Sequence, residues 1–194
     1  IISAHAMDDP GYRNIWVCHG FDCKFESQIS LSSSEWHSVA DWFQSGVANA
    51  TGERKQIRQA IGWMEHLVGR HGPGRQDRGL DLQNIGRASG QMDCVDESLN
   101  TTTYLKLFED SGLLHWHRVA ERIQRQPPAD AHWAGQIEEI VTAGRYVVDS
   151  WFYDNGMLPI VQRIDEWLDI PGSAARMFPG LEPIPATPAP SGNE

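Results

Sequence analysis

Long apolar runs, basic stretches and cysteines are all scarce in this sequence, and each scarcity excludes a class of function. No apolar segment approaches the roughly 20 residues that a transmembrane helix needs, so we expect no membrane span. Lys and Arg number 16 against 26 Asp and Glu, which gives a formal net charge of −10. Because no Lys/Arg-rich stripe is present to replace the counterions of a nucleic-acid backbone, we expect no nucleic-acid partner.

The chain has only three cysteines, Cys18, Cys23 and Cys94. The pair in "VCHGFDCKF" has two interpretations. In an exported protein such a pair closes a small disulfide loop and leaves Cys94 as a free thiol. In a cytosolic protein Cys18, His19 and Cys23 begin a metal site, but no second cysteine pair supplies the remaining ligand at a sensible spacing. The disulfide is the favoured interpretation.

The bulk composition is that of an ordinary globular protein. The 194 residues, 40% hydrophobic, suffice for one domain with a sizeable core, and eight tryptophans favour dense packing. We expect a single domain over residues 7–175 and a flexible Pro-rich tail over 176–194. Residues 1–6, "IISAHA", are either the end of a signal peptide or residues added to the natural chain. With the cysteines, they favour an exported protein, periplasmic or secreted, over a cytoplasmic one.

The order of expected elements indicates the fold class. Residues 14–31 predict a hairpin, and 32–44 (capped by Ser34) and 52–72 predict helices. A Gly-rich loop over 72–91 leads to a helix capped by Asp93 and stopped at Gly112. Strands follow over 113–123, 131–141 and 145–152, and then a short strand or helix over 160–168. This order predicts an α+β fold in which helices pack on one antiparallel sheet.

Cys94 is the candidate nucleophile, because it begins the predicted helix. Helix N–H groups and the helix dipole favour an anion there, and the same N–H groups can form an oxyanion hole. A nucleophilic thiol also needs a base and a group that orients the base. His132 begins one predicted strand and Asp149 ends the next, so neighbouring antiparallel strands would place the two side by side.

Other assignments remain open at this level. Cys94 alone is more simply a buried structural thiol, and the acids around it are more simply helix-cap residues. His115 or His117, an H-x-H on a strand, is an alternative base or metal ligand, and Asp154 in "YDNG" is a fallback orienting residue.

Three stretches carry a family resemblance: "SGLLHWHRV" after the Cys94 helix, "AHWAG" and "RYVVDSWF". Together, over residues 90–155, they resemble the transglutaminase-like superfamily of papain-fold cysteine enzymes. The resemblance implies that Cys94 is the nucleophile, His132 the general base and acid, and Asp149 the residue that orients the imidazole. Gln91 is the candidate accessory residue of the oxyanion hole.

The expected function is cysteine-dependent acyl chemistry on an amide bond, without a cofactor. The first hypothesis is a bacterial peptidase or amidase of the cell envelope acting on a protein or peptide substrate, as the resemblance implies. A protein-crosslinking transglutaminase uses the same triad. Two further hypotheses are a non-catalytic binding module with this fold and a metal-binding protein built on Cys18, His19 and Cys23.

Overall fold

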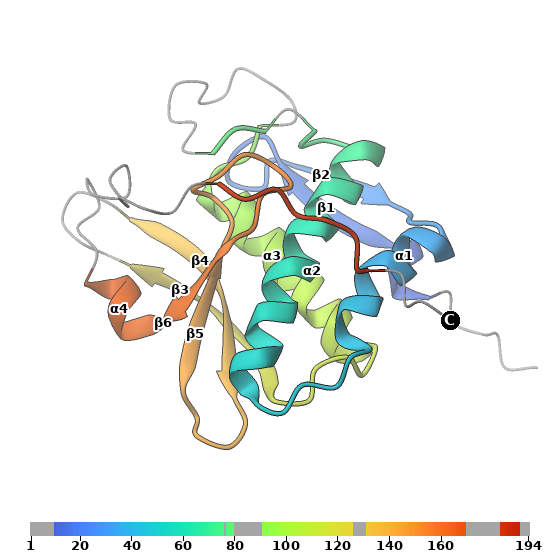
Figure 1. Cartoon of the computed structure of the whole chain (residues 1–194). Helices are drawn as coiled ribbons and strands as arrows, with labels where there is room; N and C mark the ends of the chain where they lie inside the picture. Colours follow the sequence, from blue (N-terminus) through green and yellow to red (C-terminus); the bar gives the residue numbers. More distant parts are fainter. Residues whose placement is uncertain (1–9, 76, 80–90, 126–130, 170–182, 191–194) are drawn as a thin grey trace, which may run out of the picture.

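The computed structural model describes residues 10–75, 77–79, 91–125, 131–169 and 183–190 (Figure 1). Residues 1–6, most of the predicted Gly-rich loop and residues 176–182 lie outside this part of the chain. The described part holds two short 3-10 turns, four α-helices and six strands. These are η1 (Gly11–Arg13), β1 (Ile15–His19), β2 (Phe25–Ile29), α1 (Ser33–Ala40), η2 (Asp41–Phe43), α2 (Ala50–His71), α3 (Cys94–Asp110), β3 (His117–Arg125), β4 (His132–Glu139), β5 (Arg145–Asp149), β6 (Ile160–Arg163) and α4 (Ile164–Leu168).

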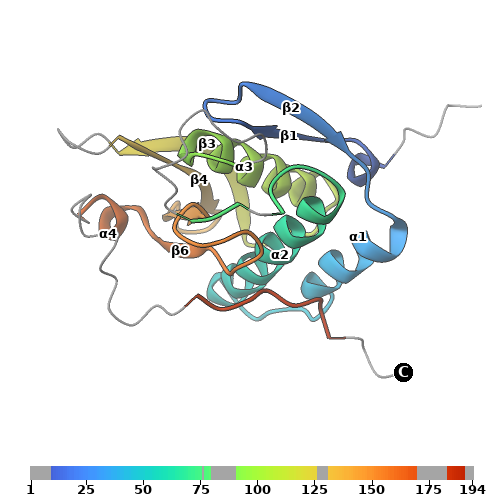
Figure 2. The same ribbon diagram turned by 90° about the horizontal axis from the view of Figure 1, so that it is seen from above.

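The strands form two antiparallel sheets, so the predicted α+β class is confirmed and the expectation of one sheet is corrected. β1 and β2 make a separate two-stranded hairpin, and β3-β4-β5-β6 make a four-stranded sheet in sequence order. Residues 160–168, predicted as a short strand or helix, form one of each: β6 covers the first four residues, and α4 follows directly. The two sheets are separate because helix α3 lies between them (Figure 2).

Helix α3 occupies the centre of the molecule. It packs against β3 and β4 with one side, against β1 with another, and beside α2 (Figures 1 and 2). Its approach to the sheet is close: a Cβ added at Gly135 of β4 would lie 3.0 Å from Thr101 Cγ2. The main hydrophobic core gathers around this helix and includes Leu105 and Phe108, whose side chains are inaccessible to solvent. The residue that begins α3 is therefore positioned from several sides at once.

Local sequence signals explain where the helices begin. Asp93 caps α3 as predicted, and its carboxylate accepts hydrogen bonds from Val95 N and Asp96 N. The cap of α1 is Ser32 and not Ser34, because Glu35 completes a capping box with Ser32. Asn49 caps α2, whose 22 residues extend slightly before the predicted start.

The C-terminal segment 183–190 belongs to the region predicted as a flexible tail and is hydrogen-bonded to other parts of the chain. It runs in extended conformation past α2 toward α1, as the dark red ribbon shows (Figure 1). Leu158 N donates to Ile184 O at 2.8 Å, and Ala186 N donates to Gly156 O at 2.8 Å. Proline leaves the N–H groups of its neighbours free to bond, so a Pro-rich segment can still be held by another chain segment. Among the described residues, no helix is both long and apolar enough to cross a bilayer.

Candidate active site

His132 and Asp149 form a buried, hydrogen-bonded pair. His132 begins β4 and Asp149 ends β5, the neighbouring strand, and His132 Nε2 lies 2.8 Å from Asp149 Oδ2. Both side chains are almost inaccessible to solvent, with exposed fractions of 2% and 1%. Because the carboxylate can only accept, Nε2 carries the proton, and Nδ1 is left as the acceptor in the neutral ring.

Trp167 of α4 completes the surroundings of Asp149. Its indole Nε1 donates to Asp149 Oδ2 at 2.9 Å, and its side chain is fully buried. Three aromatic rings, Trp151, Phe152 and Trp167, surround the imidazole with centroids 4.8 to 5.7 Å away. This packing fixes the ring plane of His132. No local pattern marked Trp167, because α4 comes next to β5 only through the fold.

Cys94, at the N-terminus of α3, influences the pKa of the same imidazole. Burial lowers the pKa of His132, but the charge and hydrogen bond of Asp149, together with the interaction with Cys94, outweigh burial and raise it to about 9. Nδ1 is buried and has no partner at hydrogen-bond distance within the described residues, so it is the ring nitrogen left for the thiol. The thiol is half-buried and free. The structure therefore pairs His132 with Asp149 and places Cys94 near enough to the imidazole to raise its pKa.

The acidic neighbours of Cys94 are turned toward the β1–β2 loop. Asp96 accepts from Phe21 N at 2.8 Å and from Cys23 N at 2.7 Å, and Asp93 accepts from Asp22 N at 3.1 Å. These three loop residues all have positive φ, between 50° and 70°, so their N–H groups converge on the two carboxylates. Burial, and then the charge of Asp93, raises the pKa of Asp96 to about 6.

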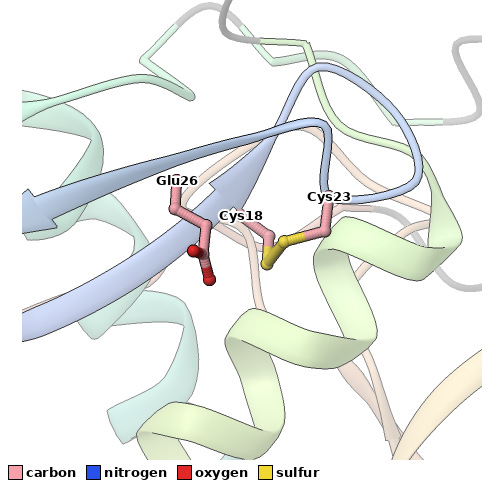
Figure 3. A group of neighbouring side chains, drawn as sticks. All are labelled: Cys18, Cys23 and Glu26. Carbon is pink, nitrogen blue, oxygen red and sulfur yellow. A yellow bond between two sulfur atoms is a disulfide. The ribbon is translucent and has the colours of Figure 1, made fainter.

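The predicted Cys18–Cys23 disulfide is present and closes this loop beside the first turn of α3 (Figure 3). Sulfur atoms of both cysteines and a carboxylate oxygen of Glu26 lie within 4.8 Å of one another. A metal site would need free thiolates, and the disulfide uses both sulfurs. The alternative in which Cys18, His19 and Cys23 bind a metal is therefore excluded for this oxidised form.

The hydrogen bonds in the first turn of α3 indicate which backbone N–H group could belong to an oxyanion hole. The Asp93 carboxylate takes the N–H groups of Val95 and Asp96, and Glu97 N donates to Asp93 O. The remaining first-turn N–H is that of Cys94 itself, next to the sulfur. Gln91 lies three residues earlier, and its carbonyl accepts from Gly20 N at 2.9 Å. The disulfide loop thus also holds the residue that was the accessory candidate.

The alternative candidates have other partners. His117 Nδ1 lies 2.8 Å from Glu53 Oε2 in a second buried pair, between β3 and α2, and the same carboxylate binds the backbone N–H groups of His115 and Trp116. This arrangement fixes the start of β3 against α2. Asp154 is a turn residue whose Oδ1 accepts from Gly79 N at 3.0 Å.

Glu65, Asp77 and Glu97 form a buried acidic cluster between α2 and α3, which was not expected from the sequence. Burial raises the pKa of Glu65 to about 8, and burial together with the charges of Glu65 and Asp77 raises the pKa of Glu97 well above its ordinary value. Asp77 Oδ1 accepts from Met92 N at 2.7 Å, two residues before Cys94. The cluster joins α2 to the segment that leads into α3. Its acids are far apart in the sequence, which explains why no motif marked it.

Comparison of the chain with family models, curated proteins and solved structures found no match in any of the three.

Proposed function

We propose that this protein is a cysteine-dependent peptidase or amidase with a papain-like, transglutaminase-like fold and a Cys94-His132-Asp149 triad. The observation that carries the proposal is the 2.8 Å hydrogen bond between His132 and Asp149, formed where the Cys94 thiol acts on the same imidazole. A nucleophile, a base and an orienting carboxylate in this order are the components of amide-bond acyl transfer. The disulfide is compatible with an exported protein.

The proposed reaction begins from the ion pair in which the Cys94 Sγ proton has already passed to His132 Nδ1, a state that the raised pKa of His132 favours. The thiolate attacks the amide carbonyl carbon, a C–S bond forms, and the negative charge moves to the carbonyl oxygen, near the N–H of Cys94. Collapse breaks the C–N bond, and His132 gives its proton to the departing amine. Water then attacks the thioester with His132 as base, releasing the acid and restoring the thiol; a lysine amine in place of water would give a cross-link.

A groove between α3 and β3 offers room for the substrate. It has a volume of about 530 Å³ and includes Arg122 and Trp133 at its walls, with Leu99 and Thr102 from α3. Trp133 directly follows His132 in β4, but the residues that line the groove do not include Cys94, His132 or Asp149. We place the substrate chain along this groove, where its side chains would meet both apolar and charged groups.

Alkylation of Cys94 by iodoacetamide at pH 6, followed by mass spectrometry without reductant, tests the proposal. Cys94 is the free thiol, because Cys18 and Cys23 are joined. We expect labelling at least tenfold faster than that of a small-molecule thiol, and a comparable loss of rate in His132→Ala, because a base supplies the thiolate. His117→Ala is the matched control, since it also removes a buried histidine from a carboxylate pair.

The same variants are then incubated with peptide and protein substrates, with and without a lysine-bearing acceptor. Hydrolysis that is lost in Cys94→Ser supports the peptidase, whereas amine incorporation assigns the cross-linking reaction. Labelling of the wild type no faster than a free thiol, or equal in wild type and His132→Ala, would reject the triad and leave a binding module.

A further inference from the structure

We propose that Arg122 is a fourth functional residue of the site, whose guanidinium stabilises the negatively charged sulfur of Cys94. The inference rests on the proposed function and adds a group that the Cys-His-Asp triad does not include. Arg122 lies on β3, which contributes none of the three triad residues.

A β-bulge turns Arg122 toward α3. Ala120 pairs with Gln136 and Ile123 pairs with Ala134, so Glu121 and Arg122 both lie opposite Gly135. In a regular strand Arg122 would share the face of Arg118, which points away from α3 and pairs with Glu138. The one extra residue reverses the alternation beyond it. Arg122 therefore faces the helix that begins with Cys94.

The guanidinium is held next to the first turn of α3. Arg122 Nη1 donates to Ser98 Oγ at 2.9 Å, and Ser98 Oγ in turn donates to Val95 O at 3.0 Å. Ser98 is four residues after Cys94, so the two side chains are neighbours on the same helix face. This contact brings the positive charge to the side of the helix that carries the thiol.

Trp133 fixes the guanidinium from the sheet side. The Arg122 carbon Cζ lies 4.7 Å from the centroid of the Trp133 ring, a cation–π arrangement. Because Trp133 follows His132 in β4, Arg122 is tied to both elements that supply the reacting pair. Burial lowers the pKa of Arg122 and the negative charge of the Cys94 sulfur opposes that shift, so the two groups attract each other.

The charges around Cys94 make Arg122 chemically useful. His132 approaches from β4 with Asp149 behind it, and Asp93, Asp96 and Glu97 belong to the cap and first turn of α3. The charge of Asp93, and that of Asp96 above its pKa of about 6, disfavours an ionised thiol nearby, whereas Glu97 adds no charge because burial raises its pKa well above the ordinary value. The described part of the groove adds Lys106, Glu109 and Glu121 farther along. The helix needs Asp93 and Asp96 for its cap, and a fixed guanidinium offsets their repulsion of a negatively charged sulfur.

The pH profile of Cys94 alkylation tests the role of Arg122. In Arg122→Gln we expect the profile to move up by about one pH unit, which makes labelling at pH 6 about tenfold slower. Arg122→Lys keeps the charge and should retain part of the effect, and Ser98→Ala, which frees the guanidinium, should give a smaller upward shift. Arg118→Gln is the matched control on the same strand, and its profile should equal that of the wild type.

The outcomes separate this inference from the proposed function. A profile that moves in His132→Ala but not in Arg122→Gln or Ser98→Ala overturns the role of Arg122 and keeps the triad. A wild-type profile equal to that of a free thiol overturns both. Thermal unfolding shows whether Arg122→Gln folds. If it does not, Arg122→Lys and Ser98→Ala take its place in the test. Unchanged alkylation profiles in both variants overturn the inference, and an upward shift in Ser98→Ala supports it.

Discussion

The substitution Asp149→Asn removes the charge that holds a proton on His132 while keeping the shape of the side chain. The pKa of His132 is raised from 6.5 to about 9 although burial alone lowers it, and the Asp149 charge is the largest of the contributions that raise it. This net shift corresponds to about 3 kcal/mol in favour of the protonated ring. With the charge gone and burial unchanged, we expect the pKa to fall to the ordinary 6.5 or below, so that the ring is mostly neutral at pH 7.

An NMR titration of the histidine ring protons between pH 5 and 10 measures this change, with His132 assigned by its absence in His132→Gln. The matched control is Asp154→Asn, the same substitution at an acid whose Oδ1 accepts from Gly79 N. Its His132 titration should follow the wild type. A pKa for His132 that stays above 8 in Asp149→Asn would refute the reasoning, since another group would then hold the proton.

The His132–Asp149 pair also predicts how the free energy of unfolding depends on pH. The folded-state pKa of His132 lies above the unfolded value, so its stabilisation is complete below about pH 6.5 and is lost as pH rises through about 9. We expect the wild type to lose about 3 kcal/mol of unfolding free energy from this group over that window. Urea unfolding at both ends should show a smaller loss in Asp149→Asn; equal losses would contradict the assignment.

Three further predictions concern the surroundings of the site. Thr102→Trp, which fills the groove, should raise KM for peptide substrates about tenfold without changing the rate of iodoacetamide labelling at Cys94; an unchanged KM would place the substrate elsewhere. The double variant Cys18→Ser/Cys23→Ser should lose about 2 kcal/mol of unfolding free energy in urea, as loop closure predicts for so short a loop, and no loss would mean that the loop is held by other contacts alone. Glu65→Gln should lose less stability than the wild type between pH 5 and 8, because the wild-type carboxyl, whose pKa is about 8, must stay protonated while buried; parallel pH curves would argue against its burial.

Much of the architecture was predictable because its signals are local. The hairpin, the helix that begins after Asp93 and the antiparallel strands carrying His132 and Asp149 follow from turn residues, caps and apolar spacing. The cap of α1 was wrong by two residues, because three successive serines are equivalent until Glu35 selects Ser32. The contacts of segment 183–190 carry no local signal, because they are made with the backbone of distant residues, including Gly156 and Leu158.

Within the candidate site the division is sharper. Order along the chain and the family resemblance named the three triad candidates, and the spacing of Cys18 and Cys23 named the disulfide, because the chain has only three cysteines. The positions of Trp167 and Arg122 depended on a helix packed behind a strand and on one extra residue in β3, which reverses the face of every residue after it. The sequence could name the candidate reacting groups, but the groups that surround them were decided only by tertiary structure, because burial and charge act through space and not along the chain.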